Sequence, residues 1–212
     1  MPRPSSRDLL LDTAEQLFAQ GGIDAYSLRE INDAAGLSSA AIHYHFKTKE
    51  NLLREILSRR MRPVAEREDV LKKLLRQSAQ PDLREIIAAL VWPLAMVLIE
   101  EGEKGRNYLR IVARIFSEHG STLKEELPQE FQRVIVLIAK LLPRALPAIP
   151  RAILKMRHAI MIETMLSSLA SSEHLTQLWA LPGKAPRVNA KIFTERLIDF
   201  LVGGLSAPVI AQ

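Results

Sequence analysis

Apolar residues recur every three or four positions along most of the chain, which is the spacing that places them on one face of an α-helix. Leu10, Ala14 and Phe18 show this spacing near the N-terminus. The sequence has no sustained alternation of apolar and polar residues and no Asn-Gly or Asp-Gly hairpin turn, the usual marks of strands. The pattern therefore predicts an all-α protein.

Capping residues divide the first part of the chain into short helices. Ser5 with Asp8, and Ser27 with Glu30, have the spacing at which a serine and an acidic residue cap a helix start together. Glycine follows each of these two helices and favours the left-handed backbone that ends a helix. Three short helices and a longer fourth one are predicted.

The third and fourth helices begin at further capping residues. Ser38 can cap a short helix in which Ile42 and Phe46, four residues apart, face the core together. Thr48 can cap a longer helix that bends or ends near Pro63.

Longer helices are predicted after about residue 70. Their approximate bounds are 82–101, 105–118, 128–143, 150–171 and 189–202. Boundary residues include Pro128, Pro150, Asn189 and the Gly203-Gly204 pair. Residues 171–188 are expected to form a loop, with Trp179 a candidate to hold it against the helices.

Two short helices joined through a glycine, the second beginning with a serine, have the layout of a helix-turn-helix, whose second helix enters the DNA major groove. Ile42 is expected to face the core, so Tyr44, two residues later, points about 200° away from it. The small residues Ser39 and Ala40 would let this helix approach DNA closely. His43 and Tyr44 could then reach base edges or phosphate oxygens.

Charge supports DNA binding only through its placement. The net charge is +5, but basic and acidic residues nearly balance up to Arg62. Lys47 and Lys49 flank the start of the fourth helix, where its free N–H groups also favour phosphate.

Residues 27–53, SLREINDAAGLSSAAIHYHFKTKENLL, are similar to the DNA-binding head of TetR-family transcriptional regulators. The likeness covers about residues 6–60 and includes the caps, the turn and the Lys-Glu-x-Leu entry to the fourth helix. The family commonly has a tyrosine in place of His43, so His43 and Tyr44 are both candidates for its DNA-backbone contact. By residue type or by this resemblance, the candidate DNA-binding residues are Ser27, Arg29, Ser38, Ser39, Ala40, Ala41, His43, Tyr44, His45, Lys47 and Lys49. His45 is equally open to a packing role.

The resemblance implies a DNA-binding domain over residues 1–50 and a domain for ligand binding and dimerisation over residues 51–212. It implies a homodimer that binds a near-palindromic operator, represses transcription and is released by a small-molecule effector. An activator, a DNA-binding protein without a ligand, and a helical protein that binds a partner are the alternatives.

Methionine and aromatic residues could line the effector pocket, because methionine adapts to irregular shapes. An ordinary helical core is the alternative, and the sparsely charged apolar stretches weakly favour an apolar effector. The candidate pocket residues are Trp92, Met96, Tyr108, Phe116, Met156, His158, Met161 and Met165.

Two helices carry more apolar surface than one neighbour would cover, which indicates either dimerisation or burial within a large monomer. The candidate interface residues are Ile153, Leu154, Ile160, Leu169, Phe193, Leu197, Phe200 and Leu201.

No metal, cofactor or catalytic site is predicted. The chain has no cysteine, and His43 and His45 diverge on a helix without a third ligand at a suitable spacing. No Gly-x-Ser-x-Gly or phosphate-binding glycine loop is present. The longest uncharged run, 86–99, falls short of the roughly 20 residues that cross a bilayer. With no signal-peptide core at the N-terminus, a cytoplasmic location is expected.

Overall fold

The computed structural model of the protein describes residues 5–38, 40–60, 62–118, 129–178 and 189–209. Within these ranges the chain forms eleven α-helices and no strand, which confirms the all-α prediction. The helices are α1 (Ser6–Gly21), α2 (Leu28–Ala34), α3 (Ala41–His45), α4 (Lys49–Ser58), α5 (Arg62–Gln77), α6 (Leu83–Glu101), α7 (Glu103–Glu118), α8 (Gln129–Ala145), α9 (Arg151–Ala170), α10 (Ser172–Leu178) and α11 (Ala190–Ser206).

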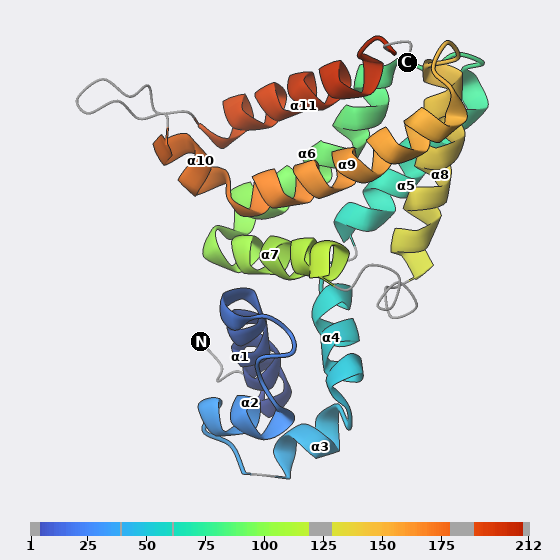
Figure 1. Ribbon diagram of the computed structural model, residues 1–212. Coiled ribbons are helices and arrows are strands. Elements are labelled where there is room, and N and C mark those ends of the chain that lie inside the picture. The colour runs from blue at the N-terminus through green and yellow to red at the C-terminus, as the bar shows by residue number, and fades with distance from the viewer. Residues whose placement is uncertain (1–4, 39, 61, 119–128, 179–188, 210–212) are drawn as a thin grey trace.

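Helices α1–α4, here called the head, form the lower part of the molecule in Figure 1. The predicted caps are present: Ser5 accepts a hydrogen bond from the N–H of Asp8, and Ser27 and Glu30 form a reciprocal capping box. Gly36 follows α2 at a φ of 67°, a conformation that a β-carbon would strain. Hydrogen bonds and backbone conformations of residues close in sequence thus determine where these short helices begin and end.

Helices α5–α11, here called the body, form the upper part of the molecule. Within the body, α7 lies between the head and the other body helices (Figure 1). Helix α5 packs on α8, α7 on α9, and α11 on both α6 and α9, while α1 of the head packs on α7. Leucine, isoleucine and valine side chains from these faces make one core that continues from the head into the body. The arrangement matches the predicted helix-turn-helix head joined to a helical bundle.

The predicted interruption near Pro63 is present, whereas the predicted loop over 171–188 was wrong at its start. Helix α4 ends at Ser58, and a separate helix α5 begins at Arg62 with Pro63 in its first turn, where the missing proline N–H does no harm. The expected loop 171–188 begins with α10, and Trp179 lies outside the described residues.

Two expected stop or start residues act differently. Helix α11 continues through Gly203 and Gly204 to Ser206, because its packing on α6 and α9 outweighs the weak helix preference of glycine. Helix α3 begins after Ala40 with no side-chain cap, and Ser38 instead accepts a hydrogen bond from Ala41 through its backbone carbonyl.

Candidate functional site

Asn32 fixes the turn between α2 and α3. Its side chain is buried, its Nδ2 donates to the carbonyl of Leu37 at 2.8 Å, and its Oδ1 accepts from the N–H of Ile42 at 3.2 Å. One amide therefore bonds to both sides of the turn and sets the position of α3 relative to α2. The sequence analysis missed Asn32, although it lies four residues after Leu28 on the inward face of α2.

The outer face of α3 carries exposed aromatic and imidazole groups. Ile42 and Phe46 are buried as predicted, whereas Tyr44 is 82% exposed and His43 is also exposed. Both side chains are therefore accessible to a partner molecule. The prediction that Tyr44 and His43 contact DNA is compatible with this exposure.

Three other predicted DNA-contact residues are engaged within the head. His45 is half-buried, with Nε2 3.0 Å from Ser6 Oγ and its ring edge-on to Tyr44. Ala41 packs partly against the core. Ser27 Oγ is occupied by Glu30, and the hydrogen bond that Ser27 N–H donates to the carboxylate lowers the pKa of Glu30.

The N–H groups at the start of α3 are less available than the sequence suggested. Ala41 N–H donates to the Ser38 carbonyl at 2.9 Å, and Ile42 N–H donates to Asn32. Ala40 is exposed, and Ser39 lies outside the described residues. This short helix has thus used two of its first donors to hold the turn.

The two lysines expected to bind phosphate have different surroundings. Lys49 Nζ donates to the Ile23 carbonyl at 3.0 Å and lies 4.0 Å from Asp24, so it ties α4 to the loop after α1. Lys47 is exposed and has a φ of 63°, a left-handed conformation that is costly for a lysine. On α2, the side chain of Arg29 is 88% exposed, with Asp33 3.9 Å away.

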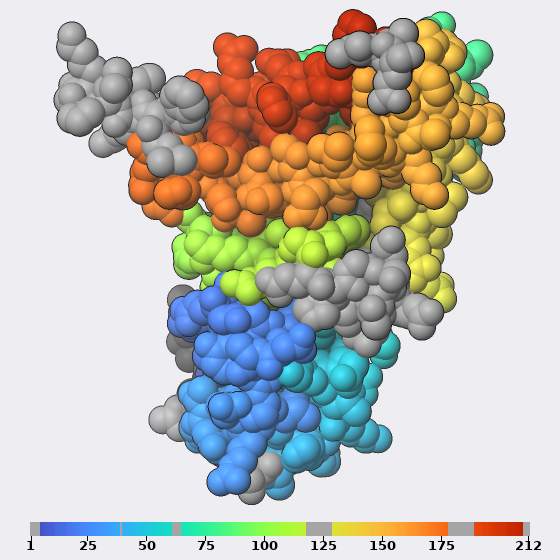
Figure 2. Space-filling view, viewed as in Figure 1, coloured from blue at the N-terminus to red at the C-terminus, as the bar shows by residue number. Residues whose placement is uncertain are grey.

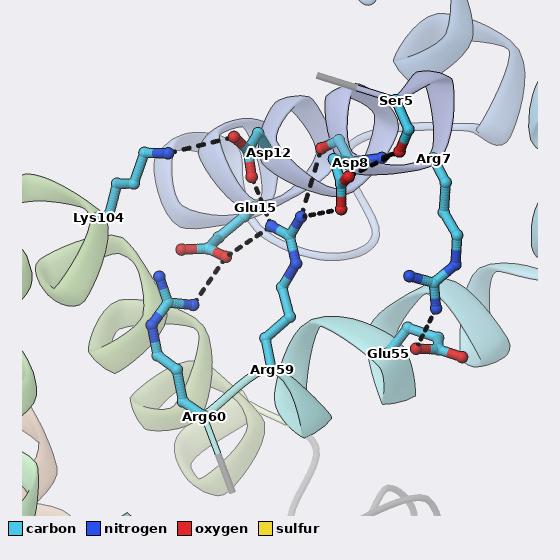
Figure 3. A network of polar contacts seen from close by, with 9 residues as sticks. All are labelled: Ser5, Arg7, Asp8, Asp12, Glu15, Glu55, Arg59, Arg60 and Lys104. Atoms are coloured by element: carbon cyan, nitrogen blue, oxygen red, sulfur yellow. Dashed lines mark hydrogen bonds and ion pairs between the residues drawn. The ribbon is translucent and has the colours of Figure 1, made fainter. Parts of the chain in front are cut away.

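A polar network joins the head to the body (Figure 3). Arg59, just after α4, bonds to Asp8 and Asp12 of α1, and Lys104 of α7 also reaches Asp12. These ion pairs are partly exposed to water, which weakens the attraction between their charges.

The buried part of this network centres on Arg60. Its Nη1 donates to Glu15 of α1 at 2.9 Å and its Nε donates to Glu101 at the end of α6 at 2.8 Å. Burial raises the pKa of Glu15 even though Arg60 faces it. The Arg60 guanidinium also lies 5.0 Å from the ring centre of Tyr108 on α7, so this arginine contacts side chains of both the head and the body.

A cavity of about 30 Å³ lies between α5, α6, α7, α8 and α9. Two predicted pocket residues, Phe116 and Met165, line it together with Arg67, which is 4% exposed. Arg67 was missed, although its place four residues before the buried Leu71 puts it on the inward face of α5.

The other predicted pocket residues are spread across the body. Tyr108 and Met161 are buried, Met96 is half-buried, and Trp92 donates to Glu195 of α11 at 3.2 Å. Met156 is 58% exposed on α9, which is inconsistent with its predicted place in an internal pocket. His158 lines a separate basic groove between α8 and α9.

The structure divides the predicted interface residues into two groups. Ile160 and Phe200 are 57% and 68% exposed, while Ile153 and Phe193 are half-buried. The expectation was wrong for four leucines that are buried within the protomer because their faces pack on neighbouring helices. These are Leu154, Leu169, Leu197 and Leu201.

Comparison with known protein families matches both parts of the chain. Residues 10–56 match the model described as bacterial regulatory proteins of the tetR family, and residues 88–204 match the tetracyclin repressor-like C-terminal domain. The second match alone spans more than half of the chain.

Several individual relatives match this chain over the head. The transcriptional repressor KstR2 of Mycolicibacterium smegmatis is 43% identical over 53 residues, which are 25% of this chain and 26% of KstR2. The alignment thus spans about a quarter of that relative's length.

Solved structures share the whole fold. NalD of Pseudomonas aeruginosa, described as a secondary repressor of a multidrug efflux pump, is 23% identical with a TM-score of 0.62, and the match covers 94% of each chain. The SmeT–triclosan complex is 22% identical with a TM-score of 0.60, covering 94% of this chain and 91% of SmeT. No helix within the described ranges is long and apolar enough to span a membrane. The chain belongs to the TetR family of DNA-binding transcriptional regulators.

Proposed function

We propose that the protein is a homodimeric, ligand-responsive repressor that binds a near-palindromic operator and is released from it by a small-molecule effector. The exposed Tyr44 on α3, held in place through Asn32, is the observation that carries the DNA-binding part. The proposal keeps a DNA-binding domain over residues 1–50 and a ligand-binding and dimerisation domain over residues 51–212.

The exposed residues of the head are its proposed DNA contacts. His43 and Tyr44 would meet bases or backbone in the major groove, and Arg29 and Lys47 would meet phosphates. Lys49 would instead position the head, since its ammonium already bonds to the Ile23 carbonyl. This assignment replaces Lys49 with Lys47 as the main phosphate-binding lysine.

The dimer would form through α9 and α11, whose surfaces adjoin in Figure 2. Four large apolar side chains there are more than half exposed, namely Met156, Ile160, Ile192 and Phe200. Gly203 and Gly204 have open space where a β-carbon would lie, so a partner's backbone could approach closely. Apolar side chains beside small residues suit the packing of a second copy.

Repression would depend on the spacing of the two heads. Successive major grooves on one face of DNA lie roughly 34 to 36 Å apart, so both α3 helices must match that distance. An effector releases DNA only by binding more tightly to a body conformation that holds the heads at another spacing. The proposed ligand response is supported by the triclosan complex of the structurally similar SmeT.

Selection of bound duplexes from a random DNA pool tests the proposal. At moderate salt, which suppresses non-specific phosphate binding, the full chain should enrich a near-palindromic motif. A reporter gene placed behind that motif should fall in expression when the protein is present. Enrichment without repression would contradict the repressor role, and no enrichment by folded protein would contradict DNA binding itself.

A further inference from the structure

The groove between α8 and α9 is lined with positive charge. Lys140 and Arg144 of α8 line one side of it, and Arg151 and Lys155 of α9 line the other. On each helix the two residues are four positions apart, so they lie on the same face about one turn, or roughly 6 Å, apart. None of the described residues that line the groove is acidic. Four cations from two helices therefore border the same space.

The sequence concentrates positive charge in this region. Residues 131–162 contain six lysines and arginines and no aspartate or glutamate, which gives the segment a charge of +6. The whole chain has a net charge of +5, so the rest of the protein is almost neutral. The excess positive charge of the protein thus belongs to α8, α9 and their connection, and not to the head.

The described part of the chain does not neutralise these four cations. Arg144 Nη1 donates to the carbonyl of Leu75 at 3.0 Å, but a carbonyl has no net charge, and the guanidinium keeps further N–H donors. Lys140, Arg151 and Lys155 are exposed, and none of them forms an ion pair or a side-chain hydrogen bond with a described residue. Their charge is therefore available to an anion that enters from the solvent.

His158 also lines the groove but adds no charge at neutral pH. Burial lowers the pKa of His158 below its usual value of 6.5, so the ring is neutral there. Its Nε2 is buried without a hydrogen-bond partner among the described residues, whereas buried polar atoms in native proteins are nearly always paired. The groove thus combines four available charges with a polar residue whose hydrogen bonding is incomplete.

The groove has the size and the lining of a small-molecule site. Its volume is about 580 Å³, within the range of about 300 to 1,000 Å³ that is usual for ligand pockets. Ala139, Leu142 and Leu154 also line it and supply apolar surface for the carbon part of a ligand. The connection between α8 and α9 lies at the end of the molecule opposite α3 (Figure 1), away from DNA that α3 would bind. A small anion therefore fits this site better than a duplex does.

We infer that this groove binds a small molecule that carries two or more phosphate groups. A phosphate monoester has about −1.5 to −2 charges at pH 7, so two of them nearly match four cations. An arginine binds phosphate through two parallel hydrogen bonds, and a lysine binds it as a point charge. A single phosphate or carboxylate would leave most of the positive charge unpaired. The site is separate from the internal cavity, and the inference goes beyond the proposed function without depending on operator binding.

Calorimetric titration of the full chain without DNA tests the inference, at about 0.15 M salt so that distant surface charges are screened. The probes are inorganic triphosphate, orthophosphate and citrate, a tricarboxylate. Triphosphate should bind at least about tenfold more tightly than either of the others, because it alone places several phosphates among the four cations. No triphosphate binding, or an equal affinity for orthophosphate or citrate, would overturn the inference.

Paired substitutions assign the binding to the groove. Lys140→Gln with Lys155→Gln removes one charge from each side and should weaken triphosphate binding at least about tenfold. The melting temperature should not change, because both lysines are exposed. Lys73→Gln with Lys191→Gln, at exposed sites on α5 and α11, removes the same net charge outside the groove and should bind as the unaltered protein does. Undiminished binding in the first pair, or an equal loss in both pairs, would overturn the assignment.

Lipid headgroups carry the same phosphate chemistry, and co-sedimentation with vesicles distinguishes them from a free molecule. The vesicles contain phosphatidylcholine and phosphatidylinositol bisphosphate. The full chain should stay in the supernatant, because a groove between two helices takes up a free anion more readily than a flat membrane surface. Sedimentation with the vesicles that is lost in Lys140→Gln with Lys155→Gln would assign the groove to a membrane and overturn the inference.

Discussion

The head and the body satisfy their buried polar groups differently. Within the described residues up to Arg60, every buried polar side-chain atom has a partner, and Asn32 and Glu15 are the deepest examples. In the body, the Tyr108 hydroxyl and His158 Nε2 are buried without a hydrogen-bond partner among the described residues. A fully bonded interior holds one conformation, whereas unused donors and acceptors leave binding capacity for something outside the chain.

Their surfaces differ as well. The head exposes one large aromatic residue, Tyr44, on a short helix, whereas the body exposes several large apolar residues along two long helices. An exposed aromatic side chain on a short helix suits contact with a DNA groove, and a row of exposed apolar side chains suits a broad apolar interface. The following predictions test this comparison, beginning with the largest expected effect.

Phe200→Glu should abolish the proposed dimer and lower affinity for the proposed operator more than a hundredfold, because a carboxylate would be desolvated against a second copy. Sedimentation velocity at micromolar concentration would measure the change in mass. Val136→Glu on α8, at a site 51% exposed, is the matched control and should leave the dimer intact. A dimer that survives Phe200→Glu would move the interface away from α11.

Asn32→Ala should lower the free energy of unfolding by about 3 kcal/mol, because it leaves the N–H of Ile42 and the carbonyl of Leu37 without their partner. Tyr108→Phe also removes a buried polar group, but this hydroxyl has no hydrogen-bond partner among the described residues. Its removal should therefore leave the free energy of unfolding unchanged or raise it. Urea denaturation of both variants gives the comparison directly. Equal losses of unfolding free energy in the two variants would contradict the distinction between a head whose buried polar groups are hydrogen-bonded and a body in which some are not.

Lys49→Ala and Lys47→Ala should separate stability from DNA binding within the head. Lys49→Ala should lower the free energy of unfolding by about 1 kcal/mol, since it removes the bond to the Ile23 carbonyl. Lys47→Ala should leave stability unchanged, weaken binding to all duplexes alike and reduce the slope of affinity against salt by about one. The reverse assignment in melting and salt-titration measurements would restore Lys49 as the phosphate-binding lysine.

Lowering the pH should weaken the ion pairs that join the head to the body. The expected loss of stability is smaller than the effects of the substitutions described above. Burial tends to raise the pKa of Asp12, but hydrogen bonds from Arg59 and Lys104 outweigh it and lower the pKa below 3.8. Stability from Asp12 is therefore fully present above pH 3.8 and is lost as the pH falls through the lower native value.

Asp12→Asn removes this titration and should reduce the fall in melting temperature between pH 5 and pH 3. Asp33→Asn, at an exposed site on α2, is the control and should change that fall less. A steeper acid loss in Asp12→Asn would contradict the sign of this contribution.

Much of the local structure of the head could be predicted from the sequence. The Ser27–Glu30 box and the burial of Ile42 and Phe46 depend on residues within four positions of one another, and such spacing is visible in one dimension. The role of Lys49 could not be predicted in this way, because its acceptor, the Ile23 carbonyl, is 26 residues away.

The candidate pocket and interface were predicted less well. Met156 and Met165 are both methionines on an apolar helix, yet one is 58% exposed and the other lines the cavity. Residue type and spacing show that a helix has an apolar face, but they do not show which neighbour covers it.

By itself, the sequence determined the all-α class, most helix boundaries, the helix-turn-helix and the family. These features follow from hydrogen bonds and side-chain contacts within single helices and turns. Only the tertiary structure decided that Arg60 joins Glu15 to Tyr108, that Arg67 lines the cavity, and that Phe200 is exposed while Leu201 is buried. The physical reason is that each of these depends on how separate helices pack, and packing brings together residues that the chain keeps far apart.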